Sequence, residues 1–599
     1  MADFEFKKLK GVVDKIFTDN KDVIATMDRF LKRYKGEWWN KDKLKDTDST
    51  ISANLFFSTV MTIAPLITDN RPIWGVRARK AYLQKYIEAF SLALEYLWDK
   101  LDLDMLTFKW ILDALIMKIG IVKCHFDPDA EFGGEVKVDV VDPRTFFCAP
   151  GYDDIWDAPL CGTRIARPLS WIRMMFPKSG KSVKSDQGEA KDYEQNEWML
   201  NVDTATVYEV WLKDDTMEEF FVDEEGEETE EKTKSKGKRK KYPYGRLVIF
   251  TEKVLLSDRP MPYRHGKPPY VALYDYINPH ELIGQGEGDQ IEELNKSFNR
   301  NLQLWDNYSK YYNDPPWLID TNAGLEIEKV KTQLLAGGGI FEYNSTTNPD
   351  PIKKVQGATP NPAMVQEMTS IKKLVEEVSG VTDITKGMST KSQRQSATEI
   401  STLIESSYTR TRQRVRNFEF SVKRVLYQML ELMQQYYTEP RTFSLKRDNN
   451  IEYYDVGNTK AFGEATVKPP EPKPGEEVPP EENDEVTKDY EDFISAFGEE
   501  DEIYAAFDLE IQTNSSLPMD KQSLANLYLR LLEMGGGNPV TALPMWEAAL
   551  TQLRIPRYKE IIAKMQELFQ QQNQPPAGPE GPMPEGPPGL MSVIQGAQG

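Results

Sequence analysis

The sequence predicts an α+β protein, and three observations support this fold class. Apolar residues recur at helical three- and four-residue steps in several long segments, most clearly over 291–312 and 404–436. Between residues 120 and 151 the chain carries two β-branched runs, "GIVKCHFDP" and "GEVKVDVVDPRTFFCAPG", on either side of the turn cluster "DPDAEFGG". Its 599 residues are enough for several cores, and 40% hydrophobic and 28% charged residues are ordinary for a folded soluble protein.

Helices are expected before the first strands. Residues 5–35 and 53–120 place apolar side chains mostly at helical steps, and Gly120 is expected to end the second region. After the hairpin, strands are predicted in "TATVYEVWLKDD" and "GRLVIFTEKVLLSD". Between these strands, "EEGEETEEKTKSKGKRKKY" is an acidic block followed by a basic block. A solvated, mobile hairpin tip is the favoured interpretation, and a basic knob that binds a partner is the alternative.

Three long helices are predicted in the second half of the chain. The first follows Asp289 and ends at "NDPP", and a compact segment with strand-like ends separates it from the second, Asn361 to Ser379. The third runs from Ile404 to Tyr436 with a heptad-like apolar seam. The first helix carries a single apolar stripe, made of Ile291, Leu294, Phe298, Leu302, Trp305, Tyr308 and Tyr312. The other faces of the third helix carry Arg410, Arg412, Arg414 and Arg416.

The C-terminal part is predicted to return to strands and then to helices. "RTFSLKRDNNIEYYDVG" and "DEIYAAFDLEIQTNSSLP" are typical of strands, and the Pro- and Glu-rich "VKPPEPKPGEEVPPEENDEV" between them is predicted to be an exposed loop. Helices are expected over 520–533 and 539–569. The Pro/Gly/Gln-rich residues after them are predicted to be a disordered tail.

Two glycine-containing stretches were tested as phosphate sites. "GQGEGD", before the first long helix, is not GxGxxG, and Glu287 and Asp289 would repel a pyrophosphate. The glycines are therefore expected to make a tight entry turn that lets the helix start close to a neighbour. "FPKSGKSVK" has Met175 where a Walker A loop needs its first glycine.

No pattern for catalysis or metal binding is found. The three histidines, His125, His265 and His280, stand in no nucleophile or metal motif, and the acidic residues do not form a two-metal motif. Three scattered cysteines argue against a disulfide framework. We therefore expect no enzymatic activity, no cofactor and no metal. The absence of long apolar runs and of a signal-peptide pattern leads us to expect synthesis in the cytoplasm.

The order of these parts resembles that of the portal proteins of tailed bacteriophages. The stretch "GIVKCHFDPDAEFGGEVKVDVVDPRTFFCAPG" is similar to the wing strands of that family, and "KPPYVALYDYINPHELIGQGEGDQIEELNKSFNRNLQLWDN" to the approach to its first stem helix. "VEEVSGVTDITKGMSTKSQRQSATEISTLIES" is similar to the second stem helix running into the tunnel loop. The resemblance covers roughly residues 50–440.

This resemblance implies a portal-protein fold that assembles as a ring, with two stem helices on either side of a small β-rich clip. The implied parts are a mixed α/β wing at 1–280, a stem helix at 281–314, the clip at 315–360, a second stem helix at 361–385, the tunnel loop at 386–396, a long wing or crown helix at 397–440, returning wing strands with the acidic Pro-rich loop at 441–515, crown helices at 516–570 and the disordered tail at 571–599.

The resemblance also implies a function and partners. Twelve copies would form a ring at one capsid vertex of the virion, assembled in the host cytoplasm, through which double-stranded DNA passes during packaging and ejection. The large terminase would dock on the clip, head–tail adaptor or head-completion proteins would follow it, and the capsid and scaffold proteins would surround the ring. The formal net charge of −21 suits a conduit, because a basic wall would retain the phosphate backbone.

Candidate functional residues follow from this interpretation. Lys386, Lys391 and Arg394 are the candidates for DNA contact in the tunnel loop, and an ordinary solvated loop is the alternative. The four arginines of the third helix, and Trp305, are candidates for contacts between subunits. Two other functions stay open from the sequence, namely another virion connector or scaffold-type protein and a nucleic-acid-processing enzyme of the packaging apparatus.

Overall fold

The chain divides into two compact units, Met1–Pro518 and Met519–Gly599, in the computed structural model. All the residues that the structure describes belong to the first unit. They are residues 2–39, 49–68, 71–79, 84–130, 133–186, 203–222, 228–229, 235–313, 317–320, 328, 340–343, 352–354, 362–381, 409–437, 441–447, 450–456 and 507–511. The predicted tunnel-loop cations, the helices expected over 520–569 and the predicted tail lie outside the described residues.

The N-terminal helices form the first part of the core. The single helix expected over 5–35 is two helices, α1 (Ala2–Asp19) and α2 (Lys21–Tyr34), because Asn20 leaves the helical conformation at φ −91° and ψ 6°. Two further helices, α3 (Leu55–Thr68) and α5 (Leu103–Met117), pack against each other, and α2 also packs on α5. The helix α4 (Gln84–Lys100) packs on β1 (Trp74–Ala78), which pairs with β18 (Phe507–Ile511).

The exit from α5 differs from the prediction. Gly120 does not end the helix. Lys118 makes the turn in a left-handed conformation, φ 69°, and Gly120 begins β2 (Gly120–Asp127). Gly120 is needed for another reason, since an added Cβ would lie 2.4 Å from the Trp110 carbonyl oxygen. The glycine at position 120 is therefore required for close packing against Trp110, and it does not end the helix.

The strands form separate sheets. The predicted hairpin is confirmed, since β2 pairs with β3 (Glu135–Val141) from Ile121↔Val141 to Asp127↔Glu135, and β12 (Tyr270–Leu273) adds to the other edge of β2. A five-stranded antiparallel sheet has the order β11-β10-β6-β5-β4, with strands Leu255–Pro260, Arg246–Thr251, Thr204–Leu212, Leu160–Pro168 and Phe146–Cys148. Between β5 and β6 the chain forms the short helices α6 (Leu169–Met175) and η3 (Gly180–Ser182).

A small ribbon lies between β6 and β10 in the sequence. In it, β7 (Met217–Val222) pairs with β9 (Ser235–Lys240) and with the two-residue β8 (Glu228–Thr229). The basic part of the block that separates the two predicted strands therefore forms β9, which pairs with the residues just before the block, with Arg239 opposite Glu218.

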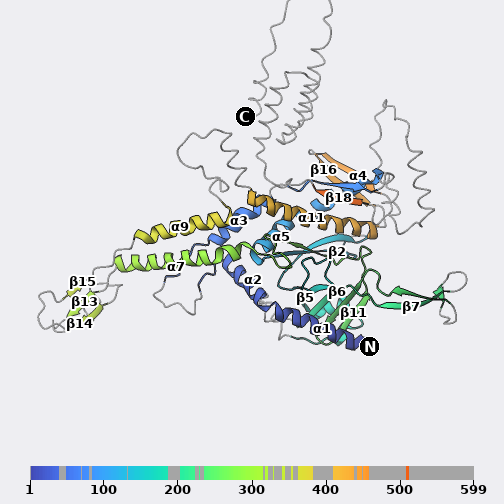
Figure 1. Ribbon diagram of the computed structural model, residues 1–599, viewed down its shortest axis with the longest axis horizontal. Coiled ribbons are helices and arrows are strands. Elements are labelled where there is room, and N and C mark those ends of the chain that lie inside the picture. Colours follow the sequence, from blue (N-terminus) through green and yellow to red (C-terminus); the bar gives the residue numbers. More distant parts are fainter. Residues whose placement is uncertain are drawn as a thin grey trace, which may run out of the picture. The chain divides into compact units, whose positions relative to one another are not determined.

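Two long helices leave and re-enter the body of the chain. The helix α7 (Glu287–Asn313) leads to a sheet of order β14-β13-β15, with strands Ile340–Tyr343, Trp317–Asp320 and Ile352–Lys354. The helix α9 (Pro362–Ser379) brings the chain back and lies beside α7 (Figure 1). Both helices begin and end close to where the apolar periodicity predicted.

The long helix α11 (Thr409–Tyr436) completes the core. Its predicted seam is confirmed, because Val415, Phe418, Val422, Val425, Met429 and Leu432 are all buried. The seam packs on β2 and β12, and Ser421 Oγ donates a hydrogen bond to the carbonyl oxygen of Ala272 at 2.8 Å. The hairpin of β16 (Arg441–Arg447) and β17 (Asn450–Val456) follows. None of the described helices is long and apolar enough to cross a membrane.

Candidate functional site

The start of α7 is built for close approach. An added Cβ would lie 2.3 Å from the Tyr276 carbonyl oxygen at Gly284, 2.6 Å from the Leu115 carbonyl oxygen at Gly286 and 2.7 Å from the Phe30 ring at Gly288. These glycines therefore let α7 begin against α5 and α2, which confirms the predicted tight entry turn. Asp289 Oδ2 accepts a hydrogen bond from the Gly286 amide at 3.1 Å, so the carboxylate occupies the helix N-terminus that a phosphate would need.

A buried ionic cluster joins α7 to α11. The guanidinium of Arg414 contacts Asp275 Oδ1 at 2.9 Å and forms an ion pair with Glu287, the first residue of α7. The side chains of Asp275 and Glu287 are fully buried, and that of Arg414 is 3% exposed. The Tyr276 hydroxyl and the Ser379 carbonyl oxygen at the end of α9 also accept from Arg414. We call these residues the Arg414 cluster.

The charges of the Arg414 cluster are unequal, with two carboxyl groups for one guanidinium. Burial raises the pKa of Asp275 well above its ordinary value, which Arg414 opposes and Glu287 reinforces. Burial alone would lower the pKa of Arg414, but Asp275 and Glu287 outweigh it and hold that pKa above its ordinary value. The cluster fixes the point at which α7, α9 and α11 meet.

The buried face of α7 is polar and holds an extended segment. Asn295 bonds the Phe56 amide at 3.0 Å and the Ala53 carbonyl oxygen at 2.8 Å, and Asn299 Oδ1 accepts from the Ala53 amide at 2.8 Å. Further along α7, Gln303 donates to the Ser49 carbonyl oxygen at 2.8 Å, and Asn307 accepts from the Ser49 amide at 3.3 Å. We call these four side chains the amide ladder. They pair with the backbone of residues 49–56 much as a neighbouring strand would.

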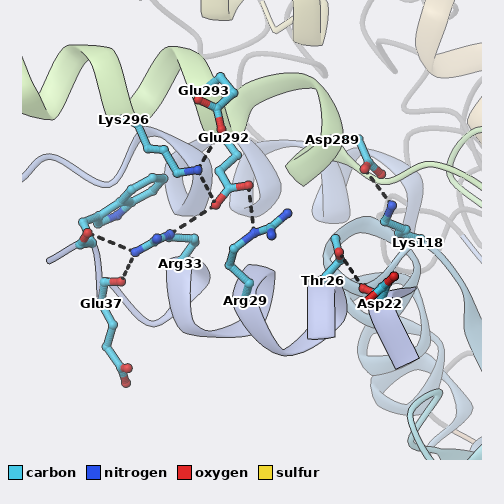
Figure 2. A network of polar contacts seen from close by, with 11 residues as sticks. Asp22, Thr26, Arg29, Arg33, Glu37, Lys118, Asp289, Glu292, Glu293 and Lys296 are labelled. Carbon is cyan, nitrogen blue, oxygen red and sulfur yellow. Dashed lines mark hydrogen bonds and ion pairs between the residues drawn. The ribbon is translucent and has the colours of Figure 1, made fainter. Parts of the chain in front are cut away.

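A second polar cluster joins α2 to α7 one turn earlier. Arg29 Nε, Arg33 Nε and Lys296 Nζ converge on the Glu292 carboxylate at 3.1, 3.3 and 3.1 Å (Figure 2). The Glu292 side chain is 7% exposed, and Lys118 pairs with Asp289 nearby at 2.7 Å. Arg33 also donates to the carbonyl oxygens of Glu37 and Trp38, which fixes the chain after α2.

Several large apolar side chains of α7 and α9 remain exposed within the described chain. Trp305 is 38% exposed and Tyr312 56% exposed on α7. On α9, Ile371 and Val375 are buried while Leu374 is 45% exposed. Exposed aromatic residues that gather on one face of a helix are typical of a surface that pairs with another protein. The predicted apolar stripe of α7 thus contributes little to the core of its own chain beyond Ile291.

Comparison with known families decides what this architecture is. The family model described as phage P22-like portal protein matches residues 13–588. The chain belongs to this portal protein family. A search of curated proteins found no match. The resemblance inferred from the sequence is therefore confirmed, and this phage portal protein is a component of the virion that serves genome packaging. The portal family is a structural family rather than an enzyme family.

The predicted site residues of this portal protein lie in different surroundings. Arg410, Arg412, Arg414 and Arg416 all lie on α11, where Arg416 is exposed and Arg412 half-buried. Arg414 makes its ion pairs within its own chain, so we assign it to the core rather than to subunit contacts. Trp305 lies on the uncovered face of α7.

Sequence reasoning missed the Arg414 cluster and the amide ladder. Arg414 is 127 residues from Glu287 in the sequence, so no local pattern connects it to the two carboxyl groups. The ladder did leave a signal, because Asn295, Asn299, Gln303 and Asn307 repeat every four residues on one helical face. In the described part of the chain no group of three or more His, Cys, Asp or Glu side chains could hold a metal ion.

Proposed function

We propose that twelve copies of this portal protein form a ring at one capsid vertex, with double-stranded DNA passing through the centre. The observation that supports assembly is the set of exposed aromatic and aliphatic side chains on α7 and α9, which the described residues of the chain leave uncovered. In a cyclic ring, each subunit presents such a face to its neighbour. The net charge of −21 suits passage of DNA rather than its retention.

The implied parts can be assigned to the elements of the structure. We propose that α7 and α9 are the two stem helices, that β13, β14 and β15 form the clip, and that residues 386–396 form the tunnel loop. The large terminase would dock on the clip during packaging, and head–tail adaptor or head-completion proteins would bind the same end later. The body that carries the five-stranded sheet would be the wing, facing capsid and scaffold proteins.

The candidates for subunit contacts are Trp305 on α7 and Arg410, Arg412 and Arg416 on α11. We propose that the arginines form salt bridges with the neighbouring subunit rather than contacts with DNA. Lys386, Lys391 and Arg394 are proposed to contact DNA at the constriction. If Lys391→Ala combined with Arg394→Ala leaves DNA packaging and retention unchanged, the loop assignment is wrong.

Electron microscopy together with native mass measurement tests the ring. Twelve copies of the 68.8 kDa chain weigh about 0.83 MDa and would show a central hole. A stable dimer or another small closed oligomer would contradict the conduit and favour a different connector or scaffold-type role.

The surface can be tested by substitution. Trp305→Glu places a charge on the uncovered face of α7 and should reduce the fraction of assembled rings at least tenfold. Met174→Glu is the matched control, because Met174 is 68% exposed on α6, outside the proposed contact. If both variants assemble equally well, the exposed face of α7 at Trp305 does not lie in the interface between subunits.

A further inference from the structure

A broad cleft lies beside the ion pairs that Arg29 and Arg33 form with Glu292. It has a volume of about 1020 Å³ and lies between one face of α2, the residues that follow α2, and residues 50–52. Its lining includes four cations, Arg29, Lys32, Arg33 and Lys35, and two aromatic residues, Trp38 and Trp39. Among the described lining residues, Asp28 and Glu37 are acidic. We call this the α2 cleft.

The charges of the α2 cleft favour an anionic ligand. Arg29 and Arg33 share the Glu292 carboxylate with Lys296, which also pairs with Glu293 at 2.7 Å, and the Arg29 side chain is still 48% exposed (Figure 2). Among the described lining residues, the four cations stand against the two carboxylates of Asp28 and Glu37, and Lys32 and Lys35 are exposed. Asp28 is also paired with Arg144 at 2.5 Å. The local balance is therefore positive in a chain whose net charge is −21.

The aromatic lining of the α2 cleft indicates a second property of its ligand. The Trp39 indole donates a hydrogen bond to the Ile51 carbonyl oxygen at 3.2 Å, which holds the ring in place while it remains partly exposed. Arg33 lies over the Trp38 ring at 5.3 Å. Grooves lined by aromatic side chains accept proline-rich segments, because proline rings pack on indole faces and a polyproline II backbone loses little entropy on binding.

One segment of this chain matches both requirements. Residues 469–486, "PPEPKPGEEVPPEENDEV", contain six prolines, seven acidic residues and one lysine. They belong to residues 457–506, which connect β17 to β18. We propose that the α2 cleft binds this acidic, proline-rich segment, with its carboxylates on Arg29, Lys32 and Lys35 and a proline on Trp39. The inference goes beyond the proposed ring and does not depend on it.

Binding of a synthetic peptide tests the proposal. The peptide, residues 469–486 with a fluorescent label, is titrated with the full chain, whose own segment carries Gln or Asn in place of its seven acidic residues so that it does not compete. We expect saturable binding that weakens steeply with added salt. A peptide with the same seven amide substitutions should not bind.

Two variants locate the binding. Lys32→Gln with Lys35→Gln should weaken peptide binding about tenfold, since each exposed ion pair contributes a factor of a few. These substitutions leave the Glu292 ion pairs intact, so the fold is expected to be kept. Lys178→Gln with Lys181→Gln removes two exposed lysines near η3 and should leave binding unchanged.

Two results would overturn the proposal. One is a peptide affinity that is the same in the two variants, or no binding at all. The other is duplex DNA that binds more tightly than the peptide and depends on Lys32 and Lys35, which would make the cleft a phosphate site. Because every binding measurement uses the unassembled chain, a failure of ring formation would not change how the binding results are interpreted.

Discussion

Replacement of Arg414 by methionine is predicted to destabilise the chain strongly. Methionine has a similar length but no charge, so Asp275 and Glu287 would be left buried without a cation. Both side chains are fully buried and Arg414 is 3% exposed, so water cannot replace the lost contacts. Removing one partner of such a buried pair costs about 3–5 kcal/mol of unfolding free energy.

The triple variant Arg414→Met, Asp275→Asn and Glu287→Gln should recover at least half of that loss. Replacement of a whole buried ionic cluster by hydrophobic residues of similar volume is often close to neutral in stability. The two amides keep the shapes of Asp275 and Glu287 without their charge, so most of the cost of an unpaired buried charge is avoided. The matched control is Arg424→Met on the same helix. Arg424 pairs with Asp154, but both side chains are more than 20% exposed, so its loss should cost about 1 kcal/mol.

Equilibrium unfolding of the unassembled chain in guanidinium chloride at pH 7, followed by tryptophan fluorescence, measures these differences. The reasoning would be refuted by a loss below about 1 kcal/mol for Arg414→Met. It would equally be refuted by a triple variant no more stable than the single one.

Three further predictions concern the same region and α11. Gly286→Ala should cost about 1–3 kcal/mol, measured by the same unfolding assay, because its Cβ would lie 2.6 Å from the Leu115 carbonyl oxygen; Gly11→Ala, with open space around it, is the control, and equal effects would contradict the packing argument. Asn295→Ala should raise hydrogen exchange at the Phe56 amide, since it removes the acceptor at 3.0 Å, and cost about 1–3 kcal/mol; unchanged exchange would rule out the bond. Burial raises the pKa of Glu431 to about 7, so the folded chain holds a proton that the unfolded chain has released, and stability should fall by up to about 1.4 kcal/mol per pH unit as the pH rises from 4.5 to 7. Glu431→Gln should flatten that part of a thermal-unfolding series, and an unchanged pH profile would contradict the assignment.

The long periodic elements of this chain could be predicted from the sequence. The apolar seam of α11 and the limits of α7 and α9 follow from steps of three and four residues, which helical geometry imposes locally. The hairpin of β2 and β3 follows from two β-branched runs around a turn.

The buried contacts at the base of α7 could not be predicted in the same way. The face of α7 that packs on residues 49–56 is that of Asn295 and Asn299, whereas Trp305, Tyr308 and Tyr312 remain exposed. Hydrophobicity alone favours the opposite arrangement. The amides are buried because each finds a backbone partner in residues 49–56, and that pairing depends on a distant segment.

The amide ladder fixes the axial position of α7. Its members repeat every four residues, so a slip by one residue would break every bond, while a slip by a full turn would bring Gln303, with its extra methylene, to a place sized for asparagine. Neutral hydrogen bonds of this kind are insensitive to ionic strength, unlike the ion pairs around Glu292. The length of α7 that extends beyond residues 49–56 should therefore stay constant when the salt concentration changes.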